Sequence, residues 1–278
     1  MNRILRFEQA WTQVYPDKIY LLRAMRDAIA TDCVEWVDLT TSNLTAIADY
    51  IAKTVTSNSC HTYFAFIKAF LNRYKDDGII PCKAPSKVFK ARKTPSQHIA
   101  LTEDEVLMWD KYIPQNECEN DVKIIFMRGC LTGARHSDCI RMSMKNVRDG
   151  KLRYVSQKTK TEVCQPVHHL LPKYLEVQPA KEHKTAVINR IISRICKNLG
   201  IDEEVTLFVN EETKTGPKYE FVSSHTSRHS FITNLALRNV PLSVMKTLAG
   251  HSDEKMTMRY IAVNVNKLDD NAMAFFEE

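Results

Sequence analysis

The sequence predicts a mainly α-helical protein in two parts, the second of which carries a small antiparallel β-sheet. Apolar residues recur at three- and four-residue spacing over long segments, which is the period of an amphipathic helix. From about residue 145 the period changes to two, which is typical of short strands. The 278 residues are 44% hydrophobic and 26% charged, so the chain can build the core of one large domain or two ordinary ones.

The first part, residues 1–80, is expected to be a small helical bundle. One helix covers residues 17–30, and a second begins near Thr41 or Ser42, whose hydroxyl groups are suited to capping it. A third helix ends at Gly78. Its apolar side chains form one stripe, which we interpret as core packing: Tyr63, Phe66, Ile67, Phe70, Leu71 and Tyr74.

A basic linker is expected over residues 81–99. The stretch from residue 79 to 99 contains three Pro, five Lys or Arg and no acidic residue. Proline disfavours regular helix, so the segment should be extended. Such a run of charge is often simply solvated, but between two folded parts it could also follow a DNA backbone. The candidate DNA contacts are Lys83, Lys87, Lys90, Arg92 and Lys93.

The second part, residues 100–278, opens with a helix start signal. Thr102 is followed three residues later by Glu105, which is the pattern of a capping box. A helix is then expected over residues 119–129. Short strands are expected around Val147, Leu152, Tyr154 and Val163, with a hairpin turn at Asp149-Gly150 and a second, polar turn at residues 158–161.

The remainder of the second part is expected to be helical. One helix begins near Lys184 and ends at Gly200, with isoleucines along one face. Further helices are predicted over residues 226–238 and 242–248, and another contains Tyr260.

Charge and cysteine usage narrow the class of protein. The net charge of +6 and the isoelectric point near 8.8 suggest a polyanionic partner, although many basic proteins bind no nucleic acid. The eight cysteines include no Cys-x-x-Cys pair, so we expect reduced thiols in a cytoplasmic protein. No apolar run is long enough to span a membrane, and the first residues do not have the pattern of a signal peptide.

Several residues of the second part have the chemistry needed to open a phosphodiester without a metal. Two arginines can hold the non-bridging oxygens, a Tyr can attack phosphorus, and a Lys or His can protonate the leaving oxygen. We expect Asp138 to orient a neighbouring Arg or His. No cluster of acidic residues suggests a metal site, and no cofactor is expected. The candidate catalytic residues are Arg135, Lys158, His225, Arg228, His251 and Tyr260.

Some of these assignments have alternatives. Lys160 lies two residues from Lys158 in the same polar turn and could be the proton donor instead. His229 is more simply explained as a helix residue beneath Arg228. Zinc binding by His225 and His229 is disfavoured because no third ligand has fitting spacing.

These motifs resemble the tyrosine recombinases, the phage integrase family. The segment of residues 132–138, Thr-Gly-Ala-Arg-His-Ser-Asp, is similar to the family's first arginine box. Lys158, in Gln-Lys-Thr, is similar to the catalytic lysine. The segments at residues 225–229 and 248–251, followed by Tyr260, resemble the second box and the nucleophile. Cys139 and Ser227 differ from the usual residues at their positions, which we interpret as variation in packing.

The resemblance implies a fold and an activity. Residues 1–80 would be a helical core-binding domain, residues 81–99 a basic interdomain linker and residues 100–278 the catalytic domain, clamped around double-stranded DNA at a specific recombination site. Tyr260 would form a 3′-phosphotyrosine, and four protomers would exchange strands between two duplexes without ATP or metal. The free protein could be a monomer. Such proteins act in bacterial, archaeal or phage-infected cells, where they integrate or excise mobile elements.

Other expectations remain open. A protein of the same fold could bind DNA without completing strand exchange, and a type IB topoisomerase would use similar chemistry. We expect no counterpart of the additional arm-binding domain that many phage integrases carry, which leaves the direction of recombination open. The apolar residues of the C-terminal segment, residues 266–278, could pack on their own domain or, as we hypothesise, on a neighbouring protomer.

Overall fold

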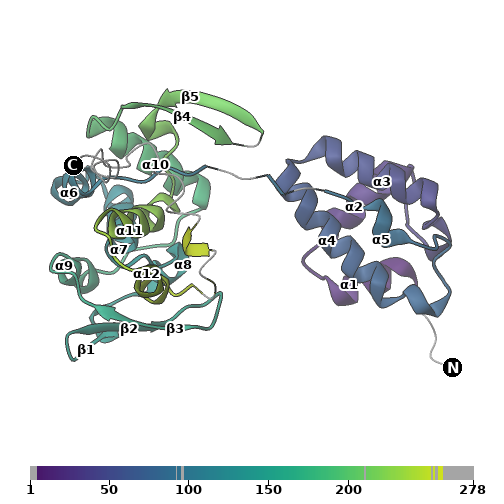
Figure 1. Cartoon of the computed structure of the whole chain (residues 1–278), viewed down its shortest axis with the longest axis horizontal. Helices are drawn as coiled ribbons and strands as arrows, with labels where there is room; N and C mark the ends of the chain where they lie inside the picture. The colour runs from purple at the N-terminus through teal and green to yellow at the C-terminus, as the bar shows by residue number, and fades with distance from the viewer. Residues whose placement is uncertain are drawn as a thin grey trace, which may run out of the picture. The chain divides into compact units, whose positions relative to one another are not determined.

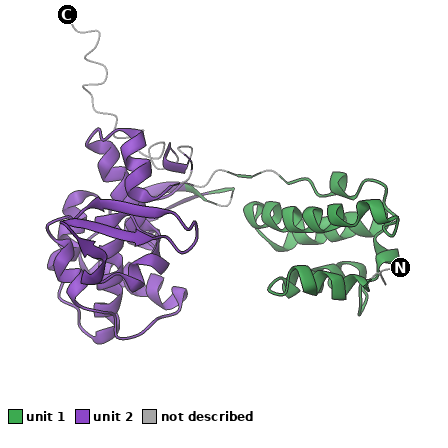
Figure 2. Cartoon of the chain, turned by 90° about the horizontal axis from the view of Figure 1, so that it is seen from below, with its two compact units in different colours: residues 1–96, 208–212 green, residues 97–207, 213–278 purple. Residues whose placement is uncertain are grey.

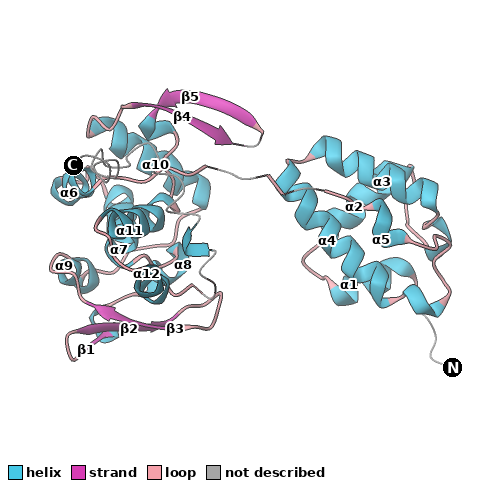
Figure 3. Ribbon diagram, in the orientation of Figure 1, coloured by secondary structure: helices cyan, strands magenta, loops and turns pink. Residues whose placement is uncertain are grey.

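The computed structural model describes residues 5–91, 93–94, 97–209, 211–251, 253 and 256–258. The chain divides into two compact units (Figure 2). The first comprises residues 1–96 and 208–212, and the second residues 97–207 and 213–278. Both are mainly helical, as the sequence predicts (Figure 3). Among the described residues, no helix is both long and apolar enough to cross a membrane.

Within the described residues, the first unit contains five helices, two of which follow threonine caps. The Thr40 hydroxyl accepts a hydrogen bond from the Asn43 amide at the start of α3, one residue before the expected cap. Thr56 caps α4 in the same way. The helices are α1 (Phe7–Val14), α2 (Ile19–Ile29), α3 (Thr41–Thr54), α4 (Ser57–Arg73) and α5 (Pro85–Val88), with single 3-10 turns η1 (Trp36–Asp38) and η2 (Lys75–Asp77).

Aromatic rings form much of the core of this unit. Phe70 of the predicted stripe is 1% exposed and contacts the rings of Phe7, Trp11 and Trp36. The interpretation of the stripe as core packing is therefore confirmed at Phe70. α1, which the sequence analysis did not predict, packs here through Phe7 and Trp11.

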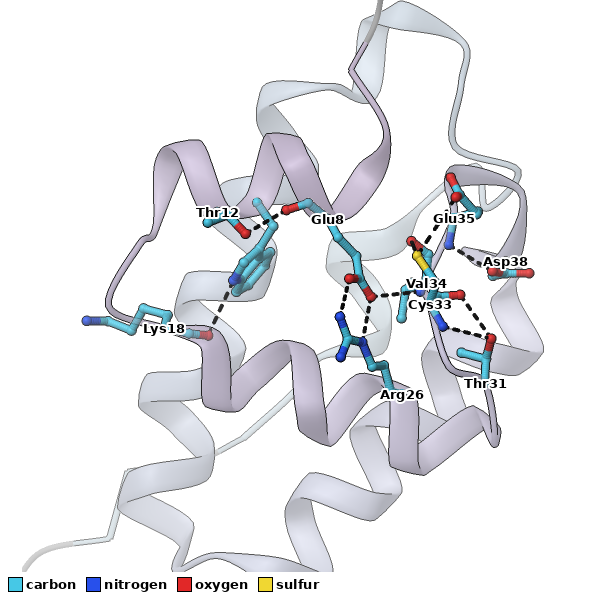
Figure 4. Close-up of polar contacts among 10 residues, drawn as sticks. Glu8, Thr12, Lys18, Arg26, Thr31, Cys33, Val34, Glu35 and Asp38 are labelled. Carbon is cyan, nitrogen blue, oxygen red and sulfur yellow. Dashed lines mark hydrogen bonds and ion pairs between the residues drawn. The ribbon is translucent and has the colours of Figure 1, made fainter.

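A half-buried carboxylate joins α1 to the rest of the unit (Figure 4). Glu8 accepts hydrogen bonds from the Arg26 guanidinium of α2 and from the Val34 amide at 2.9 Å. Hydrogen bonding with Arg26 holds the pKa of Glu8 below its usual range, although burial opposes this. The carboxylate thus ties together three segments of the bundle.

The segment after α4 is more ordered than an extended linker. Cys82 and Phe89 are buried in the core of the first unit, and the short helix α5 lies between them. Pro85 occupies the first turn of α5, where the missing N–H has no partner to lose. The expectation that proline excludes helix here was wrong, because burial of Phe89 folds the segment back onto α3 and α4.

The second unit is organised around one buried helix. Every residue of α7 (Glu117–Thr132) from Ile124 to Thr132 is buried. Figure 1 shows α7 among the other helices of the unit. These are α6 (Glu103–Lys111), α8 (His136–Arg141), α9 (Leu171–Glu176), α10 (Thr185–Asn198), α11 (Thr226–Leu237) and α12 (Leu242–Ala249), with 3-10 turns η3 (Met144–Asn146) and η4 (Lys218–Glu220).

The predicted three-stranded sheet is present. Strands β1 (Val147–Arg148), β2 (Lys151–Val155) and β3 (Glu162–Pro166) pair antiparallel in chain order. In this register Tyr154 lies opposite Val163. Gly150 has a φ of +68° in the turn between β1 and β2, which glycine adopts without steric cost. The turn between β2 and β3 presents Lys158.

A second hairpin was not predicted. Strands β4 (Glu204–Val209) and β5 (Glu212–Pro217) form a two-stranded sheet between α10 and α11, where the sequence analysis expected no strand. Its side chains are exposed or only half-buried, so their burial does not alternate as clearly as in β3. The helix expected over residues 119–129 begins two residues earlier and ends three residues later.

Candidate active site

The turn after α7 directs the first candidate arginine. Gly133 ends α7 with a φ of +66°, and a Cβ at this position would lie 2.4 Å from the Phe231 ring. Both the backbone conformation and the close packing therefore require glycine. Arg135 follows in an extended conformation and occupies the N-cap position of α8.

Asp138 connects Arg135 to the β2–β3 turn. The Arg135 Nη1 donates to Ser156 Oγ at 2.9 Å, and Ser156 Oγ donates to Asp138 Oδ2 at 3.0 Å. The Gln157 amide donates to Asp138 Oδ1 at 2.9 Å. Asp138 is 5% exposed. It can thus orient Arg135 through Ser156, a residue that the sequence analysis missed because a single serine at a strand end carries no signal.

Arg228 belongs to the first turn of α11 and is 5% exposed. Its Nη1 donates to the carbonyl oxygen of Gly133 at 2.6 Å. Its buried Nη2 has no hydrogen-bond partner among the described residues. A buried guanidinium nitrogen without an acceptor is costly, so this donor is suited to an anionic ligand.

His225 occupies the N-cap position of α11, one turn before Arg228, and is solvent-exposed. Partial desolvation lowers its pKa, and the positive charges of Arg228, Lys158 and Arg135 lower it further. The same three cations thus act on one imidazole, which places the four side chains in a single cluster.

His251 enters the cluster through a second tight turn. Gly250 ends α12 with a φ of +62°, and a Cβ there would lie 2.6 Å from Val163 of β3. His251 is 4% exposed, and its Nδ1 lies 2.9 Å from Thr257 Oγ1. Burial, with Arg228 and Arg135, lowers its pKa to about 4, so the imidazole is neutral at neutral pH.

Lys158 is exposed in the turn between β2 and β3. Hydrogen bonds from the Ser156 amide to Thr161 and from the Lys160 amide to Ser156 close this turn. Lys160 occupies the left-handed region, with a φ of +55°. The charge of Lys158, and not that of Lys160, lowers the pKa of His225. This favours Lys158 over Lys160 as the lysine of the cluster.

His229 lies half-buried beside the cluster. Its ring stacks on His98, with centroids 4.4 Å apart and an interplanar angle of 25°. Burial lowers its pKa to about 3, with contributions from His98 and His225. This agrees with the interpretation of His229 as a packing residue. No local pattern identified His98, because the contact joins residues more than a hundred positions apart.

The described structure thus brings together the candidate residues that lie far apart in sequence: Arg135, Asp138, Lys158, His225, Arg228 and His251. Tyr260 and Arg92 lie outside the described residues. Lys83, Lys87, Lys90 and Lys93 are exposed residues of the first unit. The cluster holds three cations and at least two histidines of lowered pKa, so it can bind an anion and stabilise developing negative charge.

Comparison with known proteins identifies the family of the chain and solved structures of similar fold. The model of the "Phage integrase family" matches residues 100–267. No curated protein matches the chain significantly. Among solved structures, a lambda integrase dimer bound to a core site has a TM-score of 0.68 at 15% identity, covering 95% of this chain and 98% of that one.

Two further structures share the fold. A lambda integrase tetramer bound to a Holliday junction has a TM-score of 0.68 at 15% identity, covering 96% of this chain and 80% of the other. The integrase of transposon Tn1549, in complex with a circular intermediate DNA, has a TM-score of 0.61 at 15% identity, covering 91% and 93%. The family model covers more than half of the sequence, and the chain belongs to the phage integrase family.

Proposed function

We propose that the protein is a site-specific DNA recombinase that cleaves and rejoins strands through a covalent 3′-phosphotyrosine at Tyr260. The observation that carries this proposal is the placement of two arginines at one turn. Arg228 donates to the Gly133 carbonyl, Arg135 follows two residues later, and Arg228 keeps a buried donor available for a phosphate oxygen.

The candidate residues have separate roles in cleavage. Arg135 and Arg228 hold the non-bridging oxygens of the scissile phosphate, and His225 and His251 supply further hydrogen bonds. The Tyr260 hydroxyl passes its proton to a neutral histidine of the cluster, His225 or His251, as its oxygen attacks phosphorus. One P–O bond forms while the bond to the 5′ oxygen breaks. Lys158 gives its proton to that leaving oxygen.

Rejoining reverses these steps. The free 5′-hydroxyl of one duplex returns its proton to Lys158 as its oxygen attacks the phosphotyrosine of the other. Tyr260 leaves with the proton that the histidine returns. Each cleavage conserves the energy of the phosphodiester, so ATP is not needed. The guanidinium groups supply the positive charge that a metal ion supplies in other phosphoryl-transfer sites.

The partner in this proposal is double-stranded DNA carrying a specific recombination site. By analogy with the lambda integrase tetramer bound to a Holliday junction, four protomers act on two duplexes. Residues 1–80 form the core-binding domain. The exposed Lys83, Lys87, Lys90 and Lys93 contact the phosphate backbone. The proposed role of the protein is to integrate or excise a mobile element in the cytoplasm of its host.

A strand-exchange assay distinguishes the proposed recombinase from a protein that only binds DNA. Sites would first be selected from a randomised pool of duplexes by binding to the full chain. Two duplexes of different length that carry the selected site, each with one labelled strand, would then be incubated with the protein. The proposal predicts recombinant strands of new length. Stable binding without any joined product would favour the DNA-binding alternative.

A further inference from the structure

A thiol, an imidazole and a carboxylate are aligned at the N-terminal end of α7, and the proposed recombination chemistry uses none of them. Cys118 Sγ lies 3.5 Å from His183 Nδ1, and His183 Nε2 lies 2.9 Å from Asp121 Oδ2. Asp121 is 1% exposed and the His183 side chain 8% exposed, whereas Cys118 is half-buried. The thiol is thus the most accessible of these three groups, and the imidazole and carboxylate behind it are buried.

The hydrogen bonds of Asp121 determine which nitrogen of His183 carries the proton. Asp121 accepts from the Ala180 amide at 2.7 Å and from the Lys181 amide, as an ionised carboxylate does. A carboxylate cannot donate, so His183 Nε2 carries a hydrogen and donates it to Asp121. In the neutral ring Nδ1 then has a lone pair that faces the Cys118 thiol and can accept its proton.

A second feature of the site is the position of Cys118 in its helix. Cys118 lies in the first turn of α7, a 16-residue helix, where the backbone N–H groups favour anions. Glu119 in the same turn is engaged: its carboxylate accepts from Arg194 at 2.7 Å, from the Tyr112 hydroxyl at 2.8 Å and from the Gln115 amide at 2.9 Å. Its negative charge is therefore largely offset, although Glu117 remains exposed in this turn.

We propose that Cys118 is a reactive thiol that hydroperoxides oxidise to a sulfenic acid, with His183 as its base and Asp121 as the residue that orients His183. The thiol proton passes to His183 Nδ1, and the sulfur attacks one peroxide oxygen. The S–O bond forms as the O–O bond breaks, and the leaving oxygen takes the proton from His183. Sulfur loses two electrons and the peroxide gains them, giving Cys118 sulfenic acid and water or an alcohol.

The chain offers a matched control for this chemistry. Cys164 of β3 is half-buried like Cys118. No acid–base pair like His183 and Asp121 contacts its thiol in the described part of the chain. The two thiols therefore differ in their chemical surroundings more than in their access to solvent. Oxidation can be compared between them within one molecule.

The test exposes the full-length protein to hydrogen peroxide in the presence of dimedone, which traps sulfenic acids, and follows each cysteine peptide by mass spectrometry. Cys118 is expected to be trapped at least about tenfold faster than Cys164, since a positioned base accelerates the step. His183→Gln is expected to lower the Cys118 rate toward that of Cys164 while leaving the Cys164 rate unchanged.

Equal rates at Cys118 and Cys164 in the unmodified protein would overturn the proposal, whether or not the variant folds. So would a Cys118 rate that His183→Gln leaves unchanged in a folded variant, as judged by circular dichroism. The readout is independent of strand exchange, so its failure and that of the proposed recombination can be told apart.

Discussion

Arg228 donates a hydrogen bond of 2.6 Å to the carbonyl oxygen of Gly133, which joins the first turn of α11 to the end of α7. Arg135 leaves the same turn two residues later and is held by Ser156. The positions of the two arginines are therefore coupled through one glycine turn. A site that must hold two phosphate oxygens at once depends on this coupling.

Replacing that glycine tests the coupling. Gly133→Ala introduces a Cβ at a φ of +66° and 2.4 Å from the Phe231 ring, so we expect a loss of stability of about 2–4 kcal/mol. Gly150→Ala is the control, since its φ is +68° but no atom lies within 4 Å of the added Cβ. It should cost only about 1–2 kcal/mol. Equal losses in urea denaturation would show that the contact with Phe231 is unimportant.

Substitution of Arg228 should affect the chemical step. Arg228→Lys keeps the charge but loses the planar pair of donors, so the rate of DNA cleavage should fall by about 100-fold or more. Arg238→Lys is the control, because Arg238 pairs with Glu103 at an exposed position. Its rate should stay close to that of the unmodified protein. Single-turnover cleavage of a selected site is the measurement, and an unimpaired Arg228→Lys would exclude a role for its guanidinium.

The assignment of Lys158 as proton donor predicts a selective rescue. Lys158→Ala should slow cleavage by about 100-fold on ordinary DNA, because the leaving oxygen lacks a proton. A substrate with sulfur in place of the 5′ bridging oxygen needs no such proton, so the variant should cleave it nearly normally. Lys160→Ala should behave like the unmodified protein on both substrates. If Lys158→Ala is equally slow with sulfur, its role is not proton transfer.

His251 of the cluster and the neighbouring His229 predict a loss of stability in mild acid. The pKa of His251 is lowered to about 4 and that of His229 to about 3, from an ordinary value of 6.5. The unfolded chain therefore takes up protons below about pH 6.5 that the folded chain does not. Stability is fully present above that pH and falls as pH decreases, by up to about 1.4 kcal/mol per pH unit for each histidine.

The matched variant for this effect is His229→Gln, which removes one of the two groups. The free energy of unfolding would be measured by urea denaturation from about pH 6.5 to about pH 5. Plotted against pH, it should fall less steeply for the variant than for the unmodified protein. Parallel slopes would mean that His229 titrates normally in the folded state.

The sequence predicted correctly the elements that depend on residues close together in the chain. The capping box of Thr102 and Glu105 is formed, and the turn at Gly150 lies between β1 and β2. The order and spacing of Arg135, Lys158 and Arg228 identified side chains that the fold brings together. These residues are recognisable because the chemistry of a phosphate site restricts their types.

Elements that depend on distant contacts were missed. α1 has only eight residues, and its Phe7 and Trp11 pack against the ring of Phe70, which lies about sixty positions away in the sequence. The basic segment was expected to be extended because of its prolines. The residues next to Phe89 along the chain gave no sign that this side chain is buried in the core. Ser156 and His98 lie at the site through tertiary contacts alone. Tyr260, which was predicted to lie in a helix, is outside the described residues.

The most direct test of the central proposal is a search for the covalent intermediate. The full chain would be incubated in EDTA with a selected site that carries a nick, so that the cleaved fragment diffuses away and the intermediate accumulates. We predict an adduct joined to the 3′ end of the DNA with the unmodified protein, and none with Tyr260→Phe, although that variant should still bind the DNA. An adduct that requires magnesium, or that persists with Tyr260→Phe, would contradict the account.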